Sequence, residues 1–426
     1  MEQKENILPS HACGLISFAL KLRAFIARLR PRQAGIESMD VARRPPTAFK
    51  SDTFEVVSHP ASSKLIVFFS AAGTRAGAFD FWKNGNKLDC HRLFINNGPR
   101  DEYYQAGVPG LGSSIEETAA TIRKWAEFLG ASEIYTCGSS MGAYGATLYG
   151  TLLGARVLAY APSTILRLPH SRSKKLMHPA TKVIHPDLSN HIARSPAPTF
   201  FFYGEMEPGD IYCASKIPDV PHVKITTLRH VEHAVAVYLL EIGIMLTHLN
   251  EFISNKPFSK LSASGCLLQH KEFPELFLRS FYEVKEENWN SAATIGRNAL
   301  SVFHQSDYCQ YLVGWSLVKA GKAGEALPHL SAAVALKPKH MLFRHALASC
   351  FGTLGLLTEA VDLHRQSIEI APNVARTHFN LGIALERIGD RERSKASFLK
   401  AAELSPTEPQ FARKKADLLR HQPTSS

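Results

Sequence analysis

The sequence predicts two successive folds, a mostly parallel α/β sheet domain over residues 53–254 and an all-α repeat domain over residues 273–420. In the first, short apolar runs alternate with amphipathic helical stretches, the pattern of a parallel sheet covered by helices. In the second, small residues and prolines recur every 34 residues. A period of that length is typical of stacked helix pairs that share one core.

Length and composition support this division. A chain of 426 residues is too long for one ordinary core, and 45% hydrophobic with 20% charged residues indicates a globular protein. No apolar run approaches the ~20 residues of a membrane-spanning helix. The seven cysteines are scattered and form no Cys-x-x-Cys pair. We therefore expect a reducing, cytoplasmic location, and no nucleic-acid partner despite the net charge of +11.

Residues 1–50 form a predicted N-terminal arm. Within residues 14–30, apolar residues recur at helical spacing with basic residues between them. Such a helix either docks on its own protein or makes weak contact with an anionic membrane surface, and docking is favoured. Pro45 and Pro46 predict a linker over residues 42–51.

The predicted strands of the α/β domain are short apolar or β-branched runs. They lie at residues 54–58, 65–69, 91–97, 134–137, 157–161, 198–203 and 223–228. Predicted helices fill the gaps at residues 113–129, 143–153, 211–217 and 234–253. Ser114 is expected to cap the first of these helices, with Glu117 at capping-box spacing.

One turn organises this domain. Residues 134–146 indicate a strand that enters Gly138-Ser139-Ser140-Met141-Gly142 and leaves at once as a helix of small residues. A serine on such a sharp turn is strained and exposes its hydroxyl at the sheet edge. The alternative is a plain Gly/Ser-rich turn. In this stretch the chain resembles the α/β-hydrolase superfamily, a three-layer fold, and the resemblance implies that Ser140 is the nucleophile.

The resemblance also implies two oxyanion-hole donors. One belongs to the loop after the strand at 65–69, where the sequence is Ser70-Ala71-Ala72-Gly73. Its donor would be the amide of Ala71 or Ala72, with Ala72 preferred. The other would be the amide of Met141, the residue after the nucleophile.

The same superfamily orders its catalytic residues as serine, acid, histidine. The acid is expected in the turn at residues 204–210, where Glu207 and Asp210 compete, and Asp210 is equally suited to capping the next helix. The base is expected between the last strand and the last helix, which places it at His233. His230 is the fallback.

A short basic segment at residues 163–197 occupies the position where such hydrolases insert a lid, and its charge favours anionic substrates. Its four histidines lack the spacing of a zinc site. They are His170, His178, His185 and His191. We expect no metal and no cofactor.

Residues 256–272 form a predicted linker to the repeats. The pair Leu381-Gly382 and the closing Pro406 have equivalents 34 and 68 residues earlier. This pattern resembles the tetratricopeptide (TPR) repeat, with full repeats at 307–340, 341–374 and 375–408 after a degenerate first unit. The resemblance implies a groove for a protein or peptide, in which Asn380 is the predicted contact residue.

Together these features predict a serine hydrolase that cleaves a small acyl ester or thioester through an acyl-enzyme, with a TPR module that docks a protein partner. Two alternatives stay open. One is a catalytically inactive hydrolase-fold scaffold. The other is an acyltransferase, in which an acceptor other than water takes the acyl group.

Overall fold

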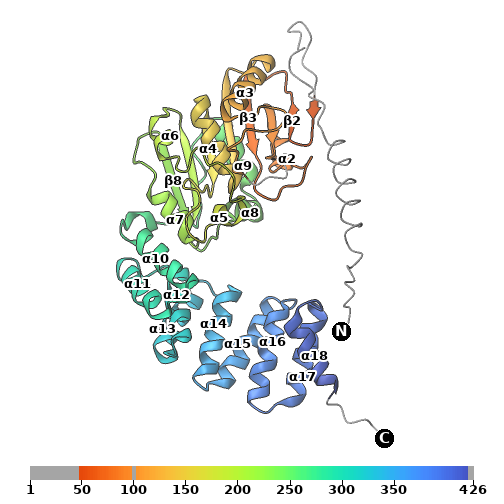
Figure 1. The fold of residues 1–426 in the computed structure, drawn as a ribbon, viewed down its shortest axis with the longest axis vertical. Helices are drawn as coiled ribbons and strands as arrows, with labels where there is room; N and C mark the ends of the chain where they lie inside the picture. Colours follow the sequence, from red (N-terminus) through yellow and green to blue (C-terminus); the bar gives the residue numbers. More distant parts are fainter. Residues whose placement is uncertain (1–47, 98–101, 421–426) are drawn as a thin grey trace, which may run out of the picture. The chain divides into compact units, whose positions relative to one another are not determined.

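A computed structural model describes residues 48–97 and 102–420 of the chain. Its N-terminal part contains an eight-stranded sheet with its helices, and its C-terminal part contains stacked helix pairs (Figure 1). The predicted amphipathic stretch at residues 14–30 lies outside the described residues. The linker predicted at 42–51 is wrong at its end, because Ala48–Lys50 forms strand β1 and pairs with β2.

The seven predicted strands are present within two residues of their expected ends. With β1 they are β2 (Phe54–Val57), β3 (Lys64–Phe69), β4 (His91–Ile95), β5 (Glu133–Ser139), β6 (Arg156–Tyr160), β7 (Thr199–Gly204) and β8 (Val223–Leu228). Their order in the sheet is β1-β2-β4-β3-β5-β6-β7-β8. From β4 to β8 all neighbours are parallel, whereas β2 is antiparallel to both of its neighbours.

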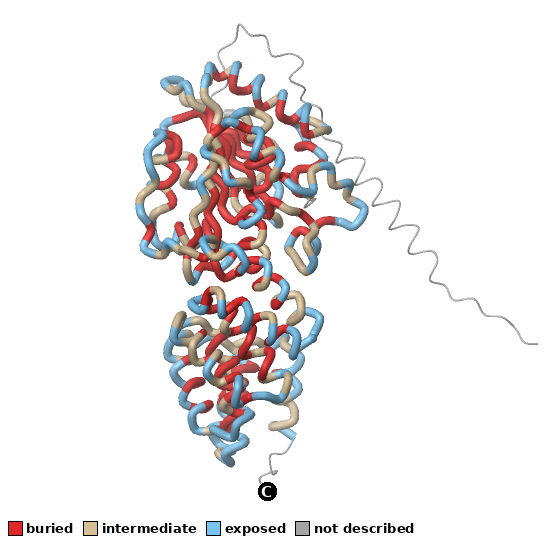
Figure 2. Tube along the Cα trace, turned by 90° about the vertical axis from the view of Figure 1, so that its left-hand side faces the viewer, coloured by how far each residue is buried: buried red, intermediate tan, exposed pale blue. Residues whose placement is uncertain are grey.

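Parallel strands end at the same edge of a sheet, so the loops that follow β3, β5, β7 and β8 lie together. The central strand β3 is buried from Leu65 to Phe69, as its continuous apolar sequence predicts for a strand covered on both faces. The sheet is the most continuously buried part of this region (Figure 2).

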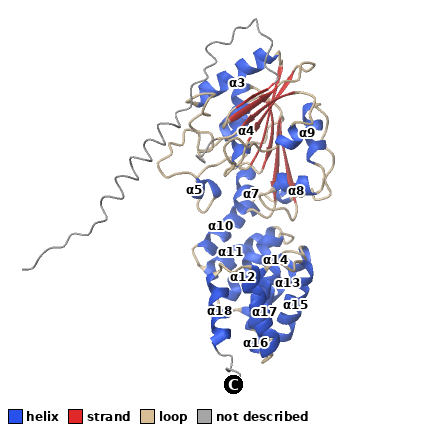
Figure 3. Cartoon of the chain, turned by 90° about the vertical axis from the view of Figure 1, so that its right-hand side faces the viewer, coloured by secondary structure: helices blue, strands red, loops and turns tan. Residues whose placement is uncertain are grey.

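Helices cover both faces of the sheet (Figure 3). Helices α3 (Ile115–Leu129) and α4 (Met141–Leu153) lie on one face, and α8 (Val235–Glu241) and α9 (Met245–Ile253) lie on the other. A short helix, α2 (Trp82–Gly85), precedes β4. Ser114 caps α3 as predicted and accepts a hydrogen bond from the Glu117 amide. The Glu117 carboxylate, however, accepts from Ser113 rather than from the capping residue.

The single helix predicted at 234–253 is wrong. The chain breaks between α8 and α9, which meet at an angle of 109°. Gly243 lies at the break with φ +76°, a conformation that ends helices and that glycine adopts without steric strain. Among the described residues, no single helix is long and apolar enough to cross a membrane. The bent pair α8 and α9 together reaches the required length and apolar composition.

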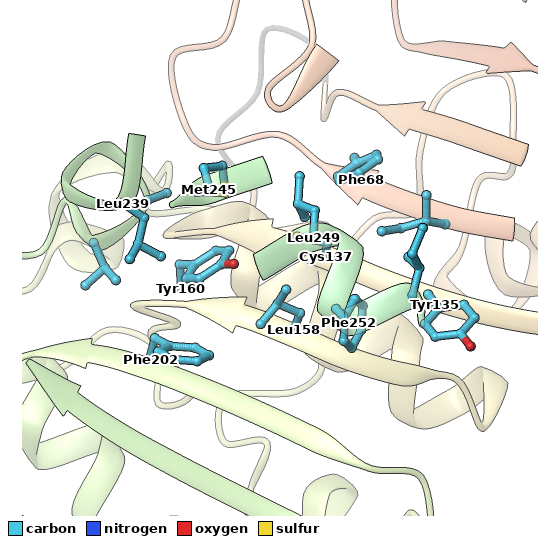
Figure 4. Close-up of a cluster of buried hydrophobic side chains, with 14 of the residues drawn as sticks. Phe68, Tyr135, Cys137, Leu158, Tyr160, Phe202, Leu239, Met245, Leu249 and Phe252 are labelled. Atoms are coloured by element: carbon cyan, nitrogen blue, oxygen red, sulfur yellow. The ribbon is translucent and has the colours of Figure 1, made fainter. Parts of the chain in front are cut away.

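The break lets both helices pack on the sheet. Leu239 from α8 and Phe252 from α9 join one buried cluster with residues of the strands (Figure 4). Within it Phe252 meets the Tyr135 ring edge-on, with centroids 5.4 Å apart. Each fully buried apolar side chain of this size contributes about 1.5–3 kcal/mol. This cluster therefore stabilises the sheet whose strands β3, β5, β7 and β8 lead into the loops at its carboxyl edge.

The predicted linker at 256–272 is not a loose connection. Leu261 and Leu267 are buried, and Ser264 forms a β-bridge with Leu228 at the end of β8. The Glu205 carboxylate accepts from the Leu267 amide at 3.0 Å. The segment, which contains a 3₁₀ turn at Leu267–Gln269, thus packs against the α/β region before the repeats begin.

In the part of the chain that the structure describes, the helices after residue 272 form four antiparallel pairs and a terminal helix. They are α10 (Phe273–Lys285) with α11 (Trp289–Val302), α12 (Asp307–Lys319) with α13 (Ala323–Leu336), α14 (Met341–Thr353) with α15 (Leu357–Ile370), α16 (Ala375–Arg387) with α17 (Arg391–Leu404), and α18 (Pro409–Arg420). Their first helices begin 34 residues apart, as the sequence period predicts. The first unit, which lacks the Leu-Gly pair, folds as a helix pair like the others.

Small residues let the paired helices approach closely. A Cβ atom on Gly314 would lie 2.5 Å from Leu330, and one on Gly382 would lie 2.8 Å from Phe398. Ser394, where the repeat pattern usually has alanine, donates to the Gly382 carbonyl at 2.8 Å. Its buried hydroxyl is therefore satisfied, and the departure from the pattern costs little.

Candidate active site

The turn after β5 brings Ser140 to the carboxyl edge of the sheet. Ser140 adopts φ 56° and ψ −119°, a backbone conformation that is costly for a residue with a side chain. The neighbouring glycines make the turn possible. A Cβ on Gly138 would lie 2.1 Å from the Gly142 carbonyl oxygen, and one on Gly142 would lie 2.0 Å from the Phe69 carbonyl oxygen. The helix α4 then starts at Met141.

Three side chains from three separate segments form a hydrogen-bonded chain at this edge. His233 Nε2 lies 2.7 Å from Ser140 Oγ, and His233 Nδ1 lies 2.7 Å from Asp210 Oδ2. A carboxylate only accepts, so Nδ1 carries the proton and Nε2 is the acceptor of the Ser140 hydroxyl. Asp210 and His233 are 5% and 8% exposed, so water competes little for these bonds.

The two acid candidates occupy different positions. Asp210 lies in the first turn of α7 (Pro208–Ser215) and bonds to His233, whereas Glu207 is the residue that precedes the helix. Asp210 therefore does not cap this helix. Glu207 pairs instead with Arg172 at 3.7 Å. Burial raises the pKa of the Glu207 carboxyl, and the nearby Asp210 charge adds to the rise.

The two histidine candidates also separate. His233 follows β8 and reaches Ser140, whereas His230 points elsewhere and its Nδ1 lies 2.9 Å from Asp307 of the repeats. The loop with both histidines packs tightly on the end of β7, the strand that precedes Asp210. A Cβ on Gly204 would lie 2.2 Å from the Glu232 carbonyl oxygen. Only glycine at position 204 permits this approach.

Two backbone amides at this edge have no acceptor among the described residues. The Ala71 N–H donates to Asp80 Oδ2 at 2.8 Å, which removes Ala71 as a donor to a ligand. Neither Ala72 nor Met141 donates an N–H to another described residue. Burial raises the pKa of the Asp80 carboxyl, while its bonds to Ala71 and Thr74 oppose the rise. Asp80 fixes this turn, a role that no sequence pattern indicated.

The basic segment at 163–197 contains two short helices, α5 (Arg172–Leu176) and α6 (Ser189–Arg194), and is anchored by buried polar side chains. Gln105 Oε1 accepts from the Ile184 and His185 amides at 2.8 and 2.9 Å. The amide of Gln105 donates to the Tyr144 hydroxyl, which in turn donates to the His185 carbonyl. The segment is thus attached to α4, the helix that starts beside Ser140.

The four histidines of this segment do not form one cluster. His185 and His191 bond to each other at 2.9 Å, and His170 bonds to Glu286 of the repeats at 2.6 Å. Across the described ranges, no three histidine, cysteine or acidic residues are grouped as metal ligands.

A cavity borders Asp210 and Glu207. Its walls come from the basic segment and from α10, which contributes Leu278, Phe281 and Tyr282. Arg172 lines it as well. The first helix pair of the repeats is therefore part of the surroundings of the site.

The predicted groove residue of the repeats lies apart from this cavity. Asn380 is half-buried on α16 and bonds through its side chain to no described residue.

Comparison with known proteins bears on the repeats. The search of curated proteins finds no match. Among solved structures, "YrrB: a TPR protein with an unusual peptide-binding site" is 20% identical at a TM-score of 0.33, covering 43% of this chain and 89% of that chain. MamA from Desulfovibrio magneticus RS-1 is 18% identical at 0.31 (41% and 94%). TTC0263, a thermophilic TPR protein in Thermus thermophilus, is 14% identical at 0.31 (44% and 96%).

The family comparison is local. The tetratricopeptide repeat model matches residues 375–408, which are the helix pair α16 and α17 and the turn that follows. These are the bounds predicted for the last full repeat. With the 34-residue step between the helix pairs, the match identifies the region that follows the mixed sheet as a TPR-like helical solenoid, a module for protein interaction.

Proposed function

We propose that the chain is a serine hydrolase in which residues 53–254 form an α/β-hydrolase domain and the TPR solenoid docks a protein partner. One observation carries the catalytic part, the chain of two 2.7 Å bonds from Asp210 through His233 to Ser140. Its support is the order of the three residues along the sequence, their three separate segments that follow β5, β7 and β8, and the strained turn at Ser140.

In the proposed reaction the Ser140 oxygen attacks the carbonyl carbon of an ester or thioester. His233 Nε2 takes the hydroxyl proton as the new bond forms and then gives it to the leaving alcohol or thiol. Water repeats these steps to release the acid and free Ser140. Asp210 holds the His233 ring in the required tautomer and stabilises the imidazolium that forms.

The amides of Met141 and Ala72 are the proposed oxyanion donors. Met141 directly follows Ser140, and Ala72 lies in the loop after β3, the strand that pairs with β5. Neither amide has an acceptor among the described residues. A donor of this kind lowers the barrier by about 3 kcal/mol when it is aimed at the developing charge. Met141 also lies at the N-terminal end of α4, where the helix dipole favours negative charge.

The TPR solenoid suits a protein or peptide ligand in its groove, and we propose Asn380 on α16 as a contact residue there. Its support is that its side chain bonds to no described residue and that it lies beside the Leu381-Gly382 pair of the repeat that the family model matches. The acyl substrate itself is proposed to be small, because Arg172 and the α10 side chains close around Asp210.

The test is turnover of a short acyl ester and of a matched acyl thioester by the full chain and by Ser140→Ala. The proposal expects hydrolysis that disappears in the variant while its thermal unfolding stays close to that of the unchanged chain. No turnover of either compound class by the unchanged chain would favour an inactive scaffold instead.

A further inference from the structure

The loop that carries His233 contacts the repeats at two positions. This loop, residues 229–234, leaves β8 and enters α8, and His233 is the member that reaches Ser140. The residues one and three positions before it, Glu232 and His230, both bond to side chains of the TPR solenoid. The loop therefore has partners beyond the α/β sheet.

The first anchor joins His230 to Asp307. His230 Nδ1 lies 2.9 Å from Asp307 Oδ2, and Asp307 begins α12 with a side chain only 4% exposed. Its second oxygen accepts from the Tyr308 amide at 2.6 Å. Moving His230 away would remove a hydrogen-bond partner from the buried Asp307 carboxylate, which costs free energy. The pair with Asp307 therefore stabilises the position of His230. His230 has φ +61°, a strained conformation that persists only when its surroundings fix it.

The second anchor joins Glu232 to the turn between α13 and α14. His340 Nε2 lies 3.1 Å from Glu232 Oε1, and Lys337 Nζ lies 3.9 Å from the same oxygen. The His340 bond is the main reason that the pKa of Glu232 lies below its usual value. Lys337 also donates to the sulfur of Met206, which lies in the turn between β7 and α7.

Inside the α/β region the two loops are locked to one another. The Met206 amide donates to the Val231 carbonyl at 3.0 Å, and Gly204 touches the Glu232 backbone. A shift of the loop at 229–234 would therefore carry the turn at 204–206 with it and move His233 relative to Ser140. Misplacement of about 1 Å in such an arrangement costs on the order of a hundredfold in rate.

We propose that Asp307 and His340 of the TPR solenoid are positioning residues for His233, so that the repeats complete the active site. This inference rests on the proposed hydrolase function. The two residues touch neither Ser140 nor His233. They act through His230 and Glu232, which hold the backbone on the N-terminal side of the base.

The experiment uses the full chain and three variants, Asp307→Asn, His340→Gln and Glu232→Gln. The matched control is Glu275→Gln, which breaks an exposed pair with Lys216 across the same boundary at 3.5 Å but far along the chain from the loop. Steady-state kinetics on one short ester separate kcat from KM. Hydrogen–deuterium exchange of peptides covering residues 228–236 reports on the loop without requiring turnover.

The expected result is a fall in kcat of about tenfold or more for Asp307→Asn and His340→Gln, with KM within about twofold and the control unchanged. Exchange in the loop should rise in the same variants. The double variant Glu232→Gln/His340→Gln should lose no more kcat than the worse single variant, because each single change already breaks the same bond between Glu232 and His340.

The outcomes distinguish the two proposals. If the unchanged chain hydrolyses no ester, the hydrolase proposal is rejected. If loop exchange nevertheless rises in Asp307→Asn and His340→Gln, the conclusion that these residues hold the loop at 229–234 stands. Loop exchange and kcat that both match the unchanged chain in these variants would overturn the positioning role. A fall in kcat with the same size in Glu275→Gln would also overturn it, since the effect would then belong to the boundary in general.

Discussion

His233 Nε2 and Ser140 Oγ lie 2.7 Å apart although 93 residues separate them in the chain. The sheet explains the meeting. Ser140 follows β5 and His233 follows β8, and both strands run parallel to the strands between them, so their ends share one edge. A nucleophile and a base at this distance are ready for proton transfer without rearrangement.

The first prediction concerns this pair. Ser140→Ala and His233→Ala should each lower ester turnover by about 10⁴-fold or more, because either change removes the activated hydroxyl. The double variant should be no worse than the single ones, since the residues act as a unit. Turnover assays and circular dichroism melts on the three proteins check both points. Substantial activity in His233→Ala would remove it as the base.

The second prediction separates the acid candidates. Asp210→Asn should lower kcat by about 10⁴-fold, because the amide no longer forces the proton onto His233 Nδ1. Glu207→Gln should leave kcat within a few fold, since Glu207 faces Arg172 and not the imidazole. Steady-state kinetics of both variants on one short ester measure the difference. Equal losses in the two variants would mean that the hydrogen bond to Asp210 does not set the tautomer.

The third prediction concerns stability against pH. Burial, with the Asp210 charge, raises the pKa of Glu207 above the unfolded value near 4.3. Its ionisation therefore opposes folding, and stability falls as pH rises from that value through the folded pKa. Glu207→Gln removes this loss. Its unfolding temperature should match that of the unchanged chain below pH 4 and exceed it at pH 7 to 8. A lower temperature at pH 7 would mean that the ion pair with Arg172 dominates.

The fourth prediction tests the packing of the repeats with two glycines. Gly314→Ala places a Cβ 2.5 Å from Leu330 and should cost about 1–3 kcal/mol of stability through overpacking. Gly324→Ala is the control, because a Cβ there meets nothing within 4 Å. It should be neutral or stabilising by up to about 1 kcal/mol. Urea titrations of both variants measure the difference, and equal effects would argue against close nesting at Gly314.

The strands, the repeats and the positions of Ser140 and His233 could be predicted because each depends on local signals. Apolar runs mark strands, a 34-residue period marks helix pairs, and Gly138 and Gly142 mark the tight turn. The break at Gly243 was missed because a glycine inside an apolar run fits both a continuous helix and a bent pair. The bent pair forms because it lets apolar residues of both α8 and α9 become buried against the sheet.

The acid and the repeat contacts could not be predicted, for a different reason. Glu207 and Asp210 lie in one turn, and only the start of α7 determines which carboxylate faces His233. The His230–Asp307 pair joins residues 77 positions apart in two different folds. No periodicity or spacing within either fold carries information about such a pair.

The most direct test of the central claim is covalent labelling of the native chain with a fluorophosphonate, followed by peptide mass mapping. A serine activated by His233 attacks phosphorus, so the account predicts one adduct, on Ser140, that is absent in Ser140→Ala and strongly reduced in His233→Ala. A folded chain that takes up no label, or one labelled equally on other serines and in Ser140→Ala, would contradict it.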